Sequence, residues 1–185
     1  ISSDSLGTLK FAGEGGANVQ TAVDTTAAGD LWDSSFGITT AEDPKTSKST
    51  NNMMSYTLPS IVDGVALSAS YTPKGSGAAS SSAYAIAYTG VEGLTLNYAT
   101  GSDDSTAGSE SDTTTMKASY AYGPITVSYS ENEFDGAGTA ANTDQEVTAY
   151  QVAYTVSDAI SISYGAEDIK TPDNASDEDM DISGI

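Results

Sequence analysis

Residues 147–166 alternate between two kinds of side chain, and this alternation constrains the fold more than any other feature of the chain. One set is mainly apolar or aromatic: Thr148, Tyr150, Val152, Tyr154, Val156, Ile160, Ile162 and Tyr164. The other set is small or neutral and polar: Ala149, Gln151, Ala153, Ser161, Ser163 and Gly165. Because successive side chains of a β-strand point to opposite faces, the pattern predicts a hairpin that turns at Ser157 and Asp158.

The polar face of this hairpin lacks the Lys, Glu and Arg side chains that usually cover a solvated sheet. Small neutral residues suit a face that lines a crowded or water-filled interior. An oily face with tyrosines suits hydrocarbon bounded by an interface. The hairpin therefore indicates a sheet with lipid on one side and a polar interior on the other.

The same pattern recurs along the chain and predicts nine strands, with a tenth beginning near residues 181–185. The first surrounds Leu9 and Phe11, and the others are expected at residues 54–61, 65–72, 83–89, 94–100, 115–122, 125–131, 147–156 and 159–166. Short connections at 62–65, 90–93, 123–124 and 157–158 alternate with long polar ones at 73–82, 101–114, 131–146 and 167–180. All short turns would then lie at one end of the sheet, which favours an all-β, antiparallel, up-and-down transmembrane barrel over a Greek-key sandwich.

Composition excludes several classes of function. The 185 residues carry 26 acidic side chains against six lysines and no arginine, a formal charge of −20, which argues against nucleic acid as a partner. The absence of Cys and His removes thiol catalysis and the commonest catalytic base and metal ligand. We therefore expect no catalytic residue, no cofactor and no metal. The apolar stretches are too short for a membrane helix of about 20 residues, whereas a spanning strand needs only about 9 to 11.

The charged residues are placed as a barrel would require. Every acidic residue is expected in a turn, a loop or a strand margin, and none in the middle of a strand, because charge facing hydrocarbon is costly. Lys10 and Lys117 lie within predicted strands, and both fall on the polar face. In a barrel they would be pore-wall charges facing the lumen.

The connection at residues 14–52 is exceptional in length, and a structureless connection of this size is uncommon unless it is functional. It holds the only tryptophan, Trp32, and one of the three phenylalanines, Phe36, which we expect to anchor it against the rest of the fold. Its acidic cluster is a candidate selectivity filter at a pore constriction: Asp24, Asp30, Asp33, Glu42 and Asp43.

The segments that flank this connection carry a family resemblance. Residues 6–13 read Leu-Gly-Thr-Leu-Lys-Phe-Ala-Gly, and residues 52–60 read Asn-Met-Met-Ser-Tyr-Thr-Leu-Pro-Ser. Asp63, Gly64 and a Ser/Ala-alternating strand that ends in Tyr71 follow. These segments resemble the strand before, and the hairpin after, the constriction loop of Gram-negative general porins, and the likeness extends over nearly the whole chain.

The resemblance implies an outer-membrane barrel of about 16 strands in the full chain, with nine to ten represented here in one partial domain at residues 1–185. It implies a homotrimer in contact with membrane lipid and lipopolysaccharide. It also implies passive diffusion of small hydrophilic solutes and ions through a pore narrowed by an inward-folded loop at residues 14–52. The acidic cluster favours a cation-preferring pore, although the arginine wall of the family has no counterpart in this sequence.

Two other classes of protein share parts of this pattern. A secreted acidic adhesin or surface-layer module, built as a β-sandwich or β-solenoid, would bury the oily faces and could bind Ca²⁺ through the acid-rich run at residues 173–181. An enzyme would have to rely on carboxylate pairs such as Glu42 with Asp43 or Asp103 with Asp104, and we expect no enzymatic activity.

Overall fold

The computed structural model describes residues 1–16, 18–20, 23, 26–28, 45, 51–75, 80–104, 110–136, 144–170 and 180–184. These residues form eleven strands: β1 (Ser2–Ser3), β2 (Gly7–Ala12), β3 (Met53–Thr57), β4 (Val65–Thr72), β5 (Ser80–Tyr88), β6 (Leu94–Asp104), β7 (Ser111–Tyr122), β8 (Ile125–Gly136), β9 (Gln145–Ser157), β10 (Ile160–Lys170) and β11 (Met180–Gly184). In this part of the chain, no helix is long and apolar enough to cross a membrane.

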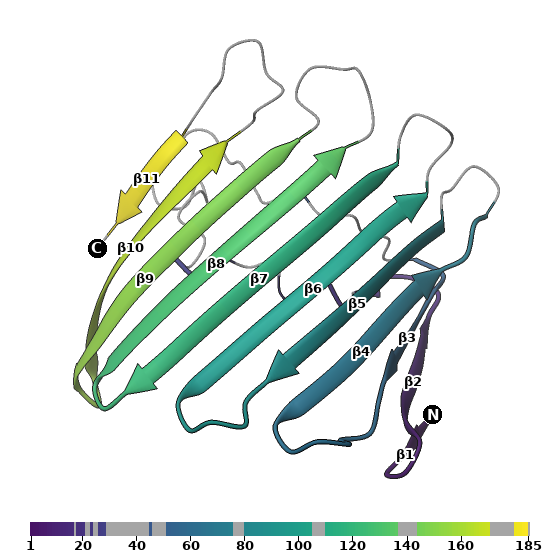
Figure 1. The fold of residues 1–185 in the computed structure, drawn as a ribbon, viewed down its shortest axis with the longest axis horizontal. Coiled ribbons are helices and arrows are strands. Elements are labelled where there is room, and N and C mark those ends of the chain that lie inside the picture. The colour runs from purple at the N-terminus through teal and green to yellow at the C-terminus, as the bar shows by residue number, and fades with distance from the viewer. Residues whose placement is uncertain are drawn as a thin grey trace.

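The strands form a single curved sheet in which each strand pairs with the next along the chain (Figure 1). Every pair is antiparallel, from β1 with β2 to β10 with β11. The predicted all-β, up-and-down meander is therefore confirmed, including a strand near residues 181–185. Over the described residues the sheet is open, with β1 and β11 as its edges.

The short turns lie together at the end of the sheet opposite the long connections (Figure 1). The turn from β3 to β4 is closed by a 3.0 Å hydrogen bond from Val65 N to Val62 O, and the turn from β5 to β6 by one of the same length from Leu94 N to Val91 O. Gly93 adopts a φ of 77°, and a Cβ there would lie 2.2 Å from the carbonyl oxygen of Ala121. Only glycine meets both conditions without strain.

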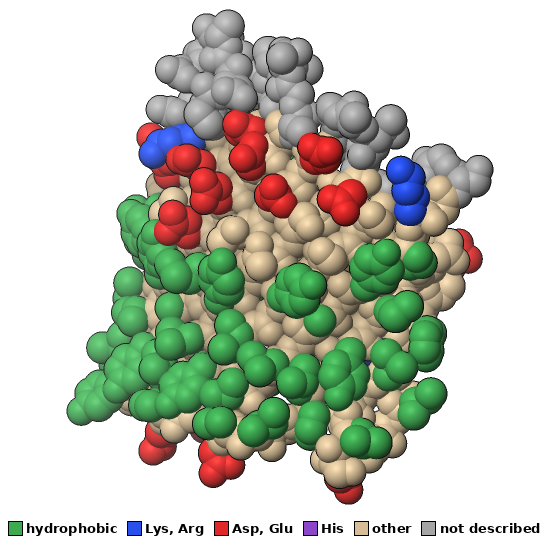
Figure 2. Space-filling model, turned by 45° about the vertical axis from the view of Figure 1, so that its right-hand side comes forward, with side chains coloured by type: hydrophobic (Ala, Val, Ile, Leu, Met, Phe, Trp, Pro, Cys, Tyr) green, Lys and Arg blue, Asp and Glu red, His purple; other side chains and the backbone are tan. Residues whose placement is uncertain are grey.

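The two faces of the sheet differ as the alternation predicts. Most outward-facing residues of β3–β10 between the two ends of the sheet are exposed and apolar, and we call this surface the apolar belt; Figure 2 shows such side chains gathered in a broad band below the acidic ones. The alternation assigns the apolar residues of each strand to the face that meets hydrocarbon, and six of them are between 37% and 56% exposed, which confirms this assignment: Tyr56, Ile86, Leu96, Val127, Val152 and Ile162. A sandwich or solenoid would have buried these side chains.

The strands near the long connections run further than the sequence indicated, so the expectation that no acid lies in mid-strand is wrong. Glu131 and Glu133 lie within β8, and Glu167 and Asp168 lie within β10. The apolar alternation ends at the upper edge of the belt, but backbone pairing continues beyond it. Figure 2 shows the resulting acidic side chains above the belt, on the side of the long connections.

Two differences concern the first strands. β3 ends at Thr57 rather than near residue 61, because Pro59 has no N–H to donate to a neighbouring strand. The last backbone hydrogen bond at this strand end runs from Leu58 N to Leu67 O, at 2.9 Å. The two-residue strand β1 was not predicted, since Ser2 and Ser3 carry no apolar alternation.

Candidate functional site

The inner face of the sheet is lined by small and neutral polar side chains, and part of it is covered. Its buried residues include alanines on β5, β6 and β9 and hydroxyl or amide side chains on β4, β7, β8 and β9: Ala83, Ala99, Ala149, Ser70, Thr113, Thr115, Ser130, Asn132 and Gln145. Side chains of this kind can hydrogen-bond a covering segment without bringing charge into the interior.

The covering segment is the connection between β2 and β3. Its two ends are joined where they leave the sheet, by hydrogen bonds from Asn52 N to Gly13 O at 3.1 Å and from Gly15 N to Asn51 Oδ1 at 3.0 Å. Further along, Val19 N donates to Ser70 Oγ on β4 at 3.2 Å. The connection therefore starts at one side of the sheet and passes over its inner face.

A chain of hydrogen bonds links two distant parts of the connection through β7, β8 and β9. Gln20 Nε2 donates to Thr115 Oγ1 at 3.0 Å, and Thr115 Oγ1 donates to Asn132 Oδ1 at 2.5 Å. Asn132 Nδ2 in turn donates to Lys45 O at 3.1 Å, and Lys45 N donates to Gln145 Oε1 at 2.7 Å. Thr115 thus binds residue 20, Asn132 and Gln145 bind residue 45, and the Thr115–Asn132 hydrogen bond connects the two attachments.

Residues 26–28 lie against β8, β9 and β10. Ala27 N donates to Ser130 Oγ at 2.8 Å, and Gln151 Nε2 donates to Ala28 O at 3.3 Å. The Thr26 hydroxyl donates to Glu167 Oε1. Ala27 and Ala28 also pack on Ala149 in a small buried apolar cluster. Packing and hydrogen bonds together hold this segment at the wall.

Gly165 on β10 makes the approach of residues 26–28 possible. A Cβ at this position would lie 3.1 Å from Ala28 Cβ and 3.2 Å from Ala28 O. These distances are shorter than normal van der Waals contacts, so a side chain here would push the segment away from the sheet. Residues 26–28 can therefore lie close to β10 only because position 165 has no side chain.

Four charged side chains of the strands belong to this inner face by the alternation: Lys10, Asp103, Lys117 and Glu167. Lys117 Nζ donates to Thr26 O at 3.5 Å, so its ammonium group lies beside the covering segment. Lys10 on β2 is exposed and pairs in register with Ser55 on β3. Glu167 is 2% exposed, and its Oε1 accepts a hydrogen bond from the Thr26 hydroxyl group of the covering segment.

The other predicted site residues lie outside the described part of the chain: Asp24, Asp30, Asp33, Glu42, Asp43, Trp32 and Phe36. Gln20 and Thr26 of the connection and Glu167 of the wall were not among the predicted site residues. Glu167 could have been found, because it continues the polar side of the alternation from Ser163 and Gly165. Gln20 and Thr26 carry no signal in the sequence that separates them from their neighbours.

In chemical terms, the inner face offers hydroxyl, amide and a few charged groups to water and solutes. Among the described residues, no group of three or more Asp, Glu, His or Cys side chains is placed to hold a metal ion. An antiparallel meander with an apolar outer belt, a polar inner face and a connection folded over that face defines the class of membrane-spanning β-proteins with a polar interior.

A family model for the Gram-negative porin matches residues 1–185, and the chain belongs to this family. Its location is therefore the outer membrane, and its family is one of channels rather than of enzymes. A search of curated protein sequences finds no significant match to the chain.

Proposed function

We propose that the chain forms a water-filled pore for passive diffusion of small hydrophilic solutes and ions, with the connection at residues 14–52 as its constriction. The observation that supports this most is the attachment of residues 20 and 26–28 to Thr115, Ser130 and Gln151. These three residues lie within β7, β8 and β9 and not at the strand ends. A connection held at this depth would narrow a pore rather than cover its mouth.

We further propose that the pore prefers cations. The chain carries a net charge of −20, and the proposed constriction at residues 14–52 holds six acids, five of which form the predicted cluster: Asp24, Asp30, Asp33, Glu42 and Asp43. Fixed negative charge around a narrow passage raises the local concentration of cations and lowers that of anions. Lys117 would oppose this effect weakly from the wall.

Reversal potentials across planar bilayers under a salt gradient test this selectivity. Asn or Gln at the five acids should shift the reversal potential toward that of a neutral pore. The shift should shrink as salt rises, because the Debye length falls from about 10 Å at 0.1 M to about 3 Å at 1 M. Anion preference in the parent would contradict the proposal.

A matched control removes the same amount of charge from the outer surface. Five exposed acids of β7, β8 and β9 can be changed to Asn or Gln together: Asp112, Glu131, Glu133, Asp135 and Glu146. Their side chains face away from the interior, so the reversal potential should stay close to that of the parent. An equal shift in both variants would mean that overall charge, and not the constriction, sets the preference.

We propose that the protein is a homotrimer surrounded by membrane lipid and lipopolysaccharide, as the resemblance to general porins implies. Light scattering of the detergent-solubilised full protein, corrected for bound detergent, measures the protein mass of the particle directly. Three chains per particle are expected. A particle that holds one chain at all concentrations would exclude the trimer.

A further inference from the structure

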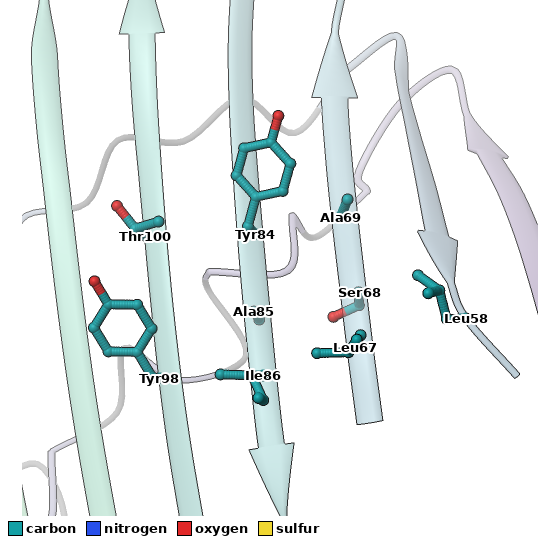
Figure 3. A pocket seen from close by; sticks show the side chains of 9 residues that line it. All are labelled: Leu58, Leu67, Ser68, Ala69, Tyr84, Ala85, Ile86, Tyr98 and Thr100. Carbon is teal, nitrogen blue, oxygen red and sulfur yellow. The ribbon is translucent and has the colours of Figure 1, made fainter. Parts of the chain in front are cut away.

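The apolar belt is not smooth, because a groove of about 530 Å³ crosses the outer face of the sheet from the end of β3 to β6 (Figure 3). Its volume falls within the range of about 300–1,000 Å³ that is usual for small-molecule sites. Leu58 and Leu67 line one side, and Ile86, Tyr84 and Tyr98 line the other. The groove is therefore apolar and opens to the side of the molecule that faces hydrocarbon.

The strand register explains why the groove exists. Ala69 on β4 is paired with Tyr56 on β3 and with Tyr84 on β5. A small side chain between two large rings leaves a hollow, and Ala69 lines the groove at this point. In the neighbouring row, Leu67 is paired with Ile86, and both residues continue the apolar lining.

The surface becomes polar in steps from the groove toward the long connections. In Figure 3, the hydroxyl groups of Tyr84 and Tyr98 point toward the end of the sheet where β4 terminates. Beyond Tyr84, the outer positions of β5 and β6 are Ser82 and Ser102, whose hydroxyl groups lie 3.2 Å apart. Next come Ser80 and Asp104, with a 3.4 Å hydrogen bond between them. An apolar groove is thus followed by hydroxyl groups and then by a carboxylate.

We propose that this groove binds one acyl chain of an outer-leaflet lipid, with the polar part of the lipid beside the hydroxyl groups of Ser82 and Ser102. Long connections face outward and short turns face the periplasm in barrels of this kind, so the polar end of the groove lies toward the outer leaflet. The acyl chain of a lipid is flexible and unbranched, so it can follow a narrow apolar hollow. It would still point from the headgroup toward the centre of the bilayer, as in the surrounding lipid. The gradient from groove to hydroxyl groups matches that of a lipid.

A second copy of the chain is the competing occupant. A stable contact between two proteins needs a broad complementary surface of about 1,200–2,000 Å² in total, of which a single groove is only a small part. The groove is narrow, and in Figure 3 the hydroxyl groups of Tyr84 and Thr100 lie toward one end of it, while Ser68 lies beside Leu67. The lipid is therefore the occupant that these observations favour.

The test is native mass spectrometry of the full protein, extracted from outer membranes in a mild detergent and then depleted of lipid. The parent should keep one lipid per chain, and its mass distinguishes a phospholipid from lipopolysaccharide. Ala69→Trp fills the floor of the groove and should lower the occupancy about tenfold or more. Parent protein stripped of this last lipid in a harsher detergent should recover one lipid from micelles that contain the zwitterionic dipalmitoylphosphatidylethanolamine, and the variant should not.

Ala118→Trp is the matched control, because Ala118 also faces outward, between Leu96 and Tyr129, but does not line the groove. It should bind lipid as the parent does. No retained or recovered lipid in the parent, or equal loss in both variants, would overturn the proposal. A change in particle mass caused by Ala69→Trp alone would instead assign the groove to a subunit contact. A single-channel conductance equal to that of the parent shows that each variant folds. If Ala69→Trp does not fold, Ala69→Leu takes its place.

Discussion

Gln20 and Thr115 are 95 positions apart in sequence, yet Gln20 Nε2 lies 3.0 Å from Thr115 Oγ1, and both side chains are fully buried. The same hydroxyl group donates to Asn132 Oδ1. One threonine side chain therefore connects the β2–β3 connection to two strands of the wall. Loss of this hydroxyl group should loosen the connection more than it perturbs the sheet.

Thr115→Val removes the hydroxyl group and keeps the size of the side chain. It leaves the Gln20 amide without its acceptor, which should weaken the docking of the connection by about 1–3 kcal/mol. Single-channel recordings should then show larger current fluctuations. Limited proteolysis should cleave the chain faster within residues 14–52. Thr115→Ser retains the hydroxyl group and should behave as the parent; fluctuations of equal size in both variants would contradict this role.

Gly165→Leu should displace residues 26–28 from β10, because even a Cβ at this position comes within 3.1 Å of Ala28. We expect a changed single-channel conductance with the barrel still folded. Ala166→Leu adds a large side chain to the same strand but on the outer face, and it should leave the conductance unchanged. The opposite ranking of the two variants would show that residues 26–28 do not control the passage.

Lys117→Met removes a positive charge beside the covering segment, where Lys117 Nζ lies 3.5 Å from Thr26 O. If the segment lines the passage, cation preference should increase, and the reversal potential under a salt gradient measures the change. Lys74→Met removes an exposed lysine beyond the end of β4 and serves as the control. If Lys74→Met shifted the reversal potential as much as Lys117→Met, the position of Lys117 beside the covering segment would not explain the effect.

Val127→Lys tests the membrane-facing surface. Val127 lies on the outer face of β8 between Ile125 and Tyr129. A Lys or Arg side chain that faces lipid at the bilayer midplane lowers the stability of a barrel by about 2–4 kcal/mol. The free energy of unfolding in lipid vesicles should fall by up to this amount. Ser128→Lys places the same charge on the inner face, where Ser128 contacts Ser119, and should cost less. Equal costs at both positions would mean that the two faces are wrongly assigned.

Glu133 and Glu146 are paired directly across β8 and β9, and both side chains are exposed above the belt. Like charges in such a pair destabilise a sheet, so Glu133→Gln should raise the thermal stability slightly, by a few tenths of a kcal/mol at low salt. High salt should abolish the gain. Glu131→Gln is the control, because Glu131 is paired with Thr148 and Met116, and it should give no gain.

The sequence was sufficient for the fold wherever one face of a strand meets hydrocarbon. Residues such as Val127, Val152 and Ile162 must alternate with polar ones there, so the strands and their order could be predicted. Beyond the belt this constraint disappears, because outward positions such as Glu131 and Asp168 meet water whether or not the backbone is paired. The predicted strands therefore stopped where the apolar residues stop and not where the hydrogen bonds stop.

The candidate site was less predictable, because its contacts join residues far apart in sequence. Nothing near Gln20 indicates a partner at Thr115, and nothing near Thr26 indicates Glu167. The length and acidity of residues 14–52 could suggest a functional connection, but amide and hydroxyl side chains are common on any surface. The contribution of Gly165 depends on the absence of a side chain facing Ala28, which a sequence pattern does not reveal.

The paired extensions of β7, β8 and β9 above the belt have a consequence for how such a protein can change over evolutionary time. Asp112 is still paired with Asp135, and Glu133 with Glu146, so the polar connections leave from a hydrogen-bonded rim and not from the membrane surface. The structural effect of an insertion, deletion or substitution in those connections would therefore not extend past this rim into the membrane-spanning part of the sheet. The exterior presented to the surroundings can therefore diverge rapidly while the wall that holds residues 20 and 26–28 stays the same.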